Sequence, residues 1–248
     1  MLSSSVRLRQ VLLTRFNWHP EFPGNDQVAL SEPWLAHRET LFRELCFASV
    51  AAQTLSDFDW ILLVHPQTPP RLIERLASWP APCRYLVWSD RSLSEVRSRL
   101  SQNTDVVLTT RLDSDDALHR QAMSQIRRFY YARPLNWVIA NFENGLQLDL
   151  QTGHLVSMRF VSPPFSTMMH VLPGDPLGMG GDHSELPIHH VYATIETGFP
   201  MFVQGIHAQN QRNRRGGGMA VVAPDLLRTE FGISASRRIG LGASETMG

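Results

Sequence analysis

Residues 105–118 read D-V-V-L-T-T-R-L-D-S-D-D-A-L, an apolar run followed at once by a cluster of acids. Residues 106–110, four of them β-branched, are typical of a buried strand. Arg111 and three carboxylates follow within a few positions: Asp113, Asp115 and Asp116. Carboxylates without partners are costly in apolar surroundings, so these acids must face solvent, basic groups or a hard cation. Their oxygens suit Mg²⁺ or Mn²⁺, which complete their coordination with water and phosphates.

The elements around this cluster place it within a sheet. Hydrophobic patterning predicts strands at 6–14, 60–64, 83–88 and 105–110, and helices at 37–52, 71–79, 92–100 and 120–132. Alternation of this kind with short links indicates an α/β protein with a doubly wound, mostly parallel sheet. The acids are therefore expected at the carboxyl end of a strand, where such sheets bind ligands. The alternative is a solvated acidic turn in which Asp116 caps the next helix.

Composition narrows the class of protein. A chain of 248 residues with 23 basic and 23 acidic side chains is long enough for a sizeable core and has no global attraction to nucleic acid. Two cysteines, Cys46 and Cys83, are too few for a disulfide framework and favour a reducing cytoplasm. The longest strongly apolar run, 60–64, is too short to span a membrane, and three arginines interrupt the N-terminus where a signal peptide needs an apolar core.

The second half of the chain has a different pattern. Segments 136–142, 146–150 and 155–161 predict an antiparallel meander, 189–197 has helical character, and 201–207 is an apolar segment that ends in a histidine. The expected division is a first half, 1–118, a second half of the same domain, 119–215, and a partly disordered tail, 216–248, with a short helix from about residue 220.

Several polar side chains are candidates for a site at the carboxyl ends of the strands. Asp115 is the first choice as a direct metal ligand, and Asp113 is expected to contact a metal or a ribose. Arg111 has the geometry to hold a phosphate with two hydrogen bonds, although a structural salt bridge would explain it equally well. His207 is a further ligand candidate that would favour Mn²⁺, the alternative being an ordinary hydrogen-bonded histidine.

A Gly-rich loop at 173–187 supplies the candidates for a catalytic base. Asp182, His183 and Glu185 lie in it, with Asp182 the first choice. The alternative is a helix N-cap followed by an acid in the first turn. His183, His189 and His190 could also suggest zinc, but their spacing matches no standard zinc pattern.

With these residues in view, the chain resembles the bacterial putative rhamnosyltransferase family, within the broader GT-A glycosyltransferases. The most specific match is R-L-D-S-D-D-A-L at 111–118, which contains the D-x-D motif of nucleotide-sugar glycosyltransferases. Supporting matches follow in order: L-T-R-F-N at 13–17, A-Q-T-L-S-D-F-D-W at 52–60, P-P-F-S-T at 163–167 and G-I-H-A-Q-N at 205–210. Many GT-A enzymes carry an acid just after the second strand, where this chain has H-P-Q-T at 65–68.

The resemblance implies a GT-A fold and a metal-dependent glycosyltransferase. The donor would be a nucleotide-diphosphate sugar, with rhamnose suggested by the family, and the acceptor a saccharide or a lipid-linked saccharide. Arg15, Asn17, Arg111 and Asp113 would contact the donor, while Asp115, Asp113 and His207 would hold Mn²⁺ or Mg²⁺. Peripheral association with a membrane is left open. The alternatives are a metal-dependent phosphohydrolase and a non-catalytic module that binds sugar nucleotides.

Overall fold

The computed structural model describes residues 6–18, 26–90, 92–160, 165–173, 191–208 and 220–234. Its larger sheet has seven strands in the order β10-β6-β9-β4-β1-β2-β3. The strands of this sheet are β1 (Leu8–Arg15), β2 (Asp59–Leu63), β3 (Arg84–Trp88), β4 (Val106–Asp113), β6 (Val138–Asn141), β9 (Thr167–Val171) and β10 (Val191–Thr194). The first four run parallel, and only β9 is antiparallel to its two neighbours. The predicted α/β fold with a mostly parallel sheet is confirmed.

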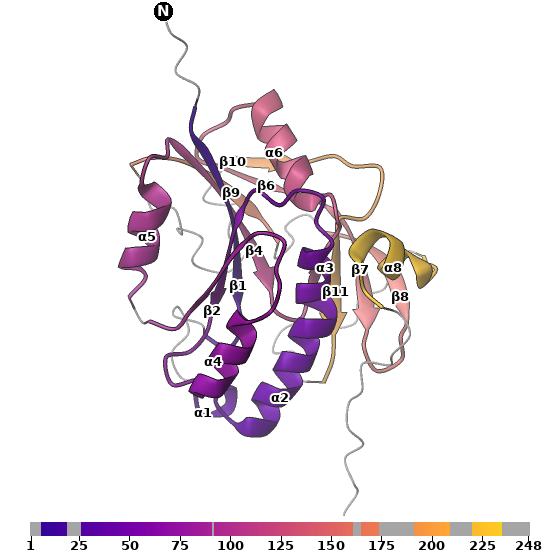
Figure 1. Cartoon of the computed structure of the whole chain (residues 1–248). Helices are drawn as coiled ribbons and strands as arrows, with labels where there is room; N and C mark the ends of the chain where they lie inside the picture. Colours follow the sequence, from indigo (N-terminus) through magenta and orange to yellow (C-terminus); the bar gives the residue numbers. More distant parts are fainter. Residues whose placement is uncertain are drawn as a thin grey trace, which may run out of the picture.

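Helices cover both faces of this sheet (Figure 1). They are α1 (Asp26–Ala29), α2 (Glu32–Leu41), α3 (Ala48–Ala51), α4 (Pro70–Ala77), α5 (Ser94–Ser101), α6 (Ala122–Ala132) and α8 (Asp225–Phe231). A π-helical segment, η1 (Phe42–Phe47), joins α2 to α3, so the helix predicted at 37–52 is continuous but not regular. None of the helices in the described ranges has the length and apolar character needed to cross a bilayer.

The alternation of side chains along β1 explains why both faces are covered. Leu12 joins a core cluster with Phe42 of η1 and Leu72 of α4. Its neighbours Val11 and Leu13 join a second cluster with α5 on the opposite face. Successive side chains of a strand point to opposite faces, so the continuously apolar centre of β1, residues 11–13, has to be buried on both faces.

A smaller sheet of four strands, in the order β5-β11-β7-β8, adjoins the larger one. Its strands are β5 (Ala117–Leu118), β7 (Asn144–Asp149), β8 (Leu155–Arg159) and β11 (Phe202–Ile206). The β7–β8 pair is the predicted antiparallel hairpin, whereas β7 and β11 are parallel. The predicted meander is therefore correct only in part, because β6 leaves it to join the larger sheet.

The helical character predicted at 189–197 is wrong for the described part of that segment. Residues Val191–Thr194 form β10, which pairs in parallel with β6. The reason is tertiary: the β-branched and aromatic residues of this segment continue the larger sheet at its edge, and pairing with β6 outweighs the local pattern.

The short helix expected from about residue 220 is confirmed as α8, and it packs against the smaller sheet. Leu227 and Phe231 are buried in a cluster with strands β7 and β11. The backbone carbonyl of Glu230 accepts a hydrogen bond of 2.8 Å from the Arg120 N–H. Residues 216–219 and 235–248 of the predicted tail lie outside the described residues, and the boundaries at 118 and 215 stay a prediction.

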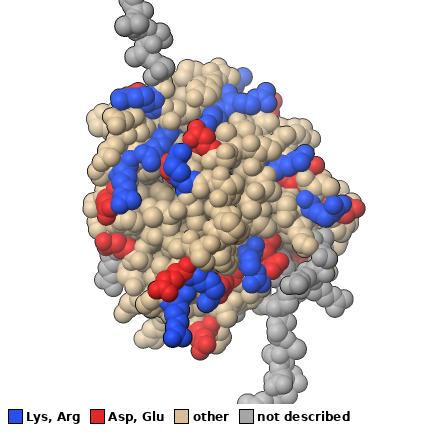
Figure 2. Space-filling model, in the orientation of Figure 1, with Lys and Arg blue, Asp and Glu red and all other residues tan. Residues whose placement is uncertain are grey.

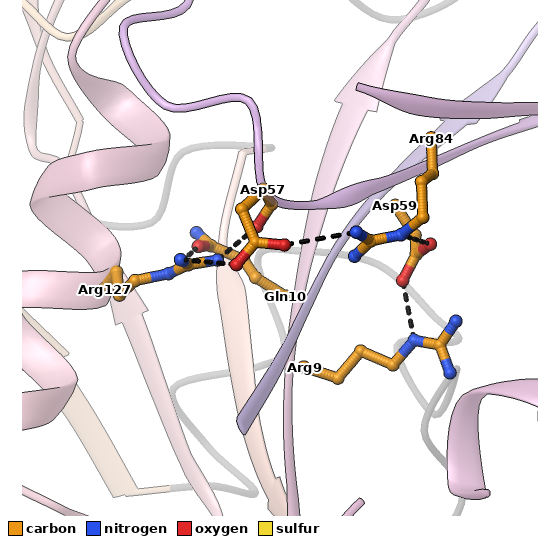
Figure 3. Close-up of polar contacts among 6 residues, drawn as sticks. All are labelled: Arg9, Gln10, Asp57, Asp59, Arg84 and Arg127. Atoms are coloured by element: carbon orange, nitrogen blue, oxygen red, sulfur yellow. Dashed lines mark hydrogen bonds and ion pairs between the residues drawn. The ribbon is translucent and has the colours of Figure 1, made fainter. Parts of the chain in front are cut away.

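A chain of ion pairs ties the amino ends of the parallel strands together (Figure 3). Asp59 at the start of β2 accepts hydrogen bonds from Arg9 of β1 at 2.6 Å and from Arg84 of β3 at 2.7 Å. Asp57 extends the chain to Arg127 of α6 at 3.1 Å. On the face of the molecule shown in Figure 2, basic and acidic side chains are interspersed.

Candidate functional site

The strands β1 and β4 bring two of the predicted residues together at their carboxyl ends. Arg15 and Asp113 are partners in the parallel register, and Arg15 Nη2 lies 3.0 Å from Asp113 Oδ1. Burial alone would raise the pKa of Asp113, but the charges of Arg15 and Arg111 outweigh it and the pKa is lowered. Asp113 is therefore a charged carboxylate held against a guanidinium, at the edge of the sheet where ligands are expected.

Asp115 connects the first half of the chain to the second. The His207 side chain, just beyond β11, places Nε2 2.9 Å from Asp115 Oδ2, and Arg38 of α2 places Nη1 3.0 Å from the same oxygen. Burial opposes ionisation of Asp115, but the charge of Arg38 and the hydrogen bond with His207 outweigh it, so its pKa lies well below its usual range. The structure thus brings together Asp115 and His207, which were each predicted as metal ligands.

Asp116 has a structural role that Asp113 and Asp115 do not share. Its Oδ1 accepts a hydrogen bond of 2.8 Å from the Gly205 N–H of β11. The alternative reading of Asp116 as a helix cap is wrong, because β5 follows it directly and α6 begins only at Ala122. Burial and the nearby charges of Asp115 and Asp113 raise the pKa of Asp116 well above its usual range. It is a tether between β4 and β11.

Gly205 is required by this close approach of β11. A Cβ added at Gly205 would lie 2.3 Å from the backbone oxygen of Asp115, which is closer than real side chains approach backbone atoms. Residues 205–207 therefore make three contacts with the acids. The Gly205 N–H donates to Asp116, and the absence of a side chain at Gly205 leaves room for the backbone of Asp115. Two residues later, the imidazole of His207 contacts the Asp115 carboxylate.

Two residues of α2 that the sequence analysis did not select also lie in this cluster. The Arg38 guanidinium packs over the ring of Trp34, 4.7 Å from its centroid, and reaches Ser114 Oγ at 3.4 Å. The His37 ring lies edge-on to that of His207, with 5.4 Å between centroids. Burial, followed by the charges of His207 and Arg38, lowers the pKa of His37. Trp34 lies before the helix predicted at 37–52, so its i, i+4 relation to Arg38 on α2 was not predicted, and nothing in the sequence placed this helix face against the acids.

Asn17 is occupied by the loops that surround it. Its Oδ1 accepts a hydrogen bond from the His65 N–H at 2.8 Å, and its Nδ2 donates to Thr68 Oγ1 at 2.9 Å. These bonds join the segment after β1 to the segment after β2. The predicted contact between Asn17 and a ligand stays a prediction.

The remaining predicted residues divide into two groups. Arg111 is buried in β4, and its backbone N–H donates to Ser166 O at 3.2 Å. Its predicted phosphate contact also stays a prediction. Asp182, His183 and Glu185 lie outside the described residues.

Asp115 and His207 are the residues that could hold a divalent ion. Their side chains meet through Oδ2 and Nε2, 2.9 Å apart, and a carboxylate oxygen and an imidazole nitrogen are both possible ligands of Mn²⁺. Within the described ranges no group of three or more histidine, cysteine, aspartate or glutamate side chains is arranged to hold a metal. The described residues thus offer one carboxylate and one imidazole, which suits an ion whose other ligands are water and phosphate.

The sequence of this chain matches one family of known proteins. The profile of the family described as "Putative rhamnosyl transferase" matches residues 13–219. No curated protein sequence matches the chain.

Solved structures with a similar arrangement include TarS 1-349 of S. aureus in complex with UDP, at 9% identity and a TM-score of 0.42 over 81% of this chain and 61% of that one. The same protein in complex with UDP-GlcNAc gives 9% identity and a TM-score of 0.45 over 83% of this chain and 60% of that one. A putative nucleotide-diphospho-sugar transferase of Desulfovibrio desulfuricans G20 gives 10% identity and a TM-score of 0.36 over 77% of this chain and 80% of that one. The chain spans about three fifths of TarS 1-349, and similarities of this size carry no conclusion about activity.

Proposed function

Because the chain belongs to the family of putative rhamnosyl transferases, we propose that it is a glycosyltransferase that takes its sugar from a nucleotide-diphosphate donor. The observation that carries the proposal is the cluster at the carboxyl ends of β1 and β4. There Arg15 pairs with Asp113, while Asp115 pairs with His207 from β11. Rhamnose, the sugar in the family's description, is the first donor sugar to test, and the acceptor is a saccharide or lipid-linked saccharide.

The proposed roles follow from the charge of each group. Arg15 and Arg111 offer positive charge to the diphosphate, and Asp113 contacts the ribose or the ion. Asp115 and His207 would hold Mn²⁺ or Mg²⁺, which when bound neutralises the charge that develops on the leaving diphosphate. Asp182 is proposed as the base that takes the proton of the acceptor hydroxyl, with Glu185 and His183 as the other candidates.

A thermal-shift panel tests the donor site. The protein is melted with UDP, dTDP, GDP and CDP, each with and without Mn²⁺, together with Asp115→Ala. A ligand at 100 times its Kd stabilises the native state by about 2.7 kcal/mol. For a domain of this size that raises the midpoint by about 5–10 °C. We expect one nucleotide to do so only with Mn²⁺, and only in the wild type.

The matched control is Asp105→Ala, which removes an exposed acid paired with Arg7 at the amino end of β4. It should keep the metal-dependent shift. If no nucleotide gives such a shift in the wild type, the donor site assigned to Asp115 is refuted.

Dependence on the acceptor separates transfer from hydrolysis. A glycosyltransferase should release the nucleotide diphosphate much faster when a saccharide acceptor is added. Equal release without any acceptor would favour the phosphohydrolase alternative.

Cys46 and Cys83 are both free thiols, which supports a reducing cytoplasm as the place where the protein works.

A further inference from the structure

We propose that Arg38 is a built-in counter-cation for Asp115, which prevents a divalent ion from binding tightly until a diphosphate binds with it. This inference rests on the proposed function, because it concerns the same site. It assigns Arg38 a positioning role that no sequence pattern indicates. Its consequence is that ion and donor bind cooperatively, each weakly without the other.

The geometry shows that Arg38 competes for the oxygen that an ion would need. Arg38 Nη1 and His207 Nε2 lie 3.0 Å and 2.9 Å from the same atom, Asp115 Oδ2. An ion bridging Asp115 and His207 would replace the hydrogen bond between them and then lie beside the guanidinium. A doubly charged ion and a guanidinium on one carboxylate oxygen repel each other strongly in a site shielded from water.

Arg38 is held where it is by its surroundings. Its side chain is only 12% exposed, and the ring of Trp34 supports the guanidinium from one side. Its Nε is buried and has no hydrogen-bond partner among the residues that the structure describes. An arginine packed in this way cannot swing into solvent without exposing the Trp34 ring, so it does not yield its position easily to an ion.

The charges around the acids lead to the same conclusion. Asp113 is paired with Arg15, Asp115 is paired with Arg38, and the guanidinium of Arg111 also acts on Asp113. Three acids, Asp113, Asp115 and Asp116, therefore lie among three guanidiniums. A divalent ion alone would add positive charge to a site whose acids are already matched by arginines, whereas an ion that enters with a diphosphate brings compensating negative charge.

The test measures Mn²⁺ binding directly, by the electron paramagnetic resonance signal of free Mn²⁺, with no nucleotide present. Wild type should bind Mn²⁺ weakly, and Arg38→Met should bind it at least about tenfold more tightly because one repelling charge is gone. Arg38→Lys keeps the charge and should behave like the wild type. Arg43→Met is the matched control, since Arg43 is exposed, follows closely on the same helical run and pairs with its neighbour Glu44.

A second variant guards against a folding defect in Arg38→Met. Trp34→Leu leaves the charge of Arg38 in place but removes its aromatic support, so an intermediate gain in Mn²⁺ affinity is expected. Thermal melting establishes that each variant is folded before binding is measured.

The outcomes separate this inference from the proposed function. In the wild type, the four nucleoside diphosphates are added one at a time, and one of them should increase Mn²⁺ binding beyond that of the nucleotide alone. If it does, but Arg38→Met and Trp34→Leu bind Mn²⁺ no better than the wild type without nucleotide, the inference fails and the proposed function stands. Tight Mn²⁺ binding by the wild type alone would likewise overturn the inference. If no variant binds Mn²⁺ under any condition, both the inference and the metal site of the proposed function are refuted.

Discussion

Replacing Asp59 by asparagine should destabilise the protein without touching the candidate site. Asp59 lies at the amino end of β2, its side chain 11% exposed, between Arg9 and Arg84 (Figure 3). Asparagine has nearly the same size, so the substitution removes the charge and leaves the packing in place. It also leaves two guanidiniums facing each other without the acid that joins them.

The structure allows the size of the effect to be worked out. Hydrogen bonds to charged groups contribute about 1.5–3 kcal/mol each when shielded from water. The Arg9 side chain is 27% exposed, so its hydrogen bond to Asp59 contributes within this range. The Arg84 side chain is 58% exposed, so its hydrogen bond contributes less than about 1 kcal/mol. A loss of about 2.5 kcal/mol in the free energy of unfolding follows, which for a domain of this size lowers the melting midpoint by about 5–10 °C.

The pKa of Asp59 determines how its contribution to the free energy of unfolding changes with pH. Burial would raise the pKa of Asp59, but the hydrogen bonds from Arg9 and Arg84 outweigh it and lower the pKa in the folded state. The stabilisation is therefore present above the unfolded pKa of about 3.9 and is lost as the pH falls through the folded value. The advantage of the wild type over Asp59→Asn should be full at pH 7 and shrink steadily below pH of about 4.

Urea unfolding followed by circular dichroism at pH 7 and in the acid range measures both quantities. The control is Asp105→Asn, whose acid is exposed and pairs with a single exposed arginine, Arg7. Its unfolding midpoint should change far less at pH 7. Equal unfolding midpoints for wild type and Asp59→Asn at pH 7, or a difference that persists unchanged in acid, would refute the reasoning.

Two further substitutions probe the junction of the two sheets. Gly205→Ala should lower the melting midpoint and abolish any nucleotide-dependent shift, because its Cβ would meet the backbone oxygen of Asp115 at 2.3 Å. The control is Gly198→Ala, which should melt like the wild type because a Cβ there meets nothing within 4 Å. Phe231→Ala should cost about 3–5 kcal/mol in urea unfolding, since Phe231 is fully buried against the smaller sheet. A loss below about 1 kcal/mol would mean that α8 is not part of the core.

The first half of the fold could be predicted because its signals are local. Each strand of the β1–β4 sheet is a short apolar run between turn-forming residues, and the parallel arrangement follows from the helices between them. The position of Asp113 and Asp115 at the carboxyl end of β4 follows from the same order. These are inferences from neighbouring residues, and the structure confirms them.

The parts that could not be predicted depend on contacts between distant segments. The two-residue strand β5 is too short to leave a pattern, and it exists because β11 pairs with it. Arg38 reads as an ordinary helical arginine until the fold brings α2 against Ser114 and Asp115. The edge strand β10 cannot be told from a helix in the sequence, because four residues carry little periodicity of their own.

The tethers on β11 have a consequence for the order of folding. The four parallel strands come from consecutive βα units, so their contacts can form while the later part of the chain is still being synthesised. Asp116 and Asp115, in contrast, receive Gly205 and His207 from residues 89 and 92 positions further along. Until β11 has left the ribosome, these two contacts cannot form. We therefore expect the nucleotide site to be among the last parts of the nascent chain to form.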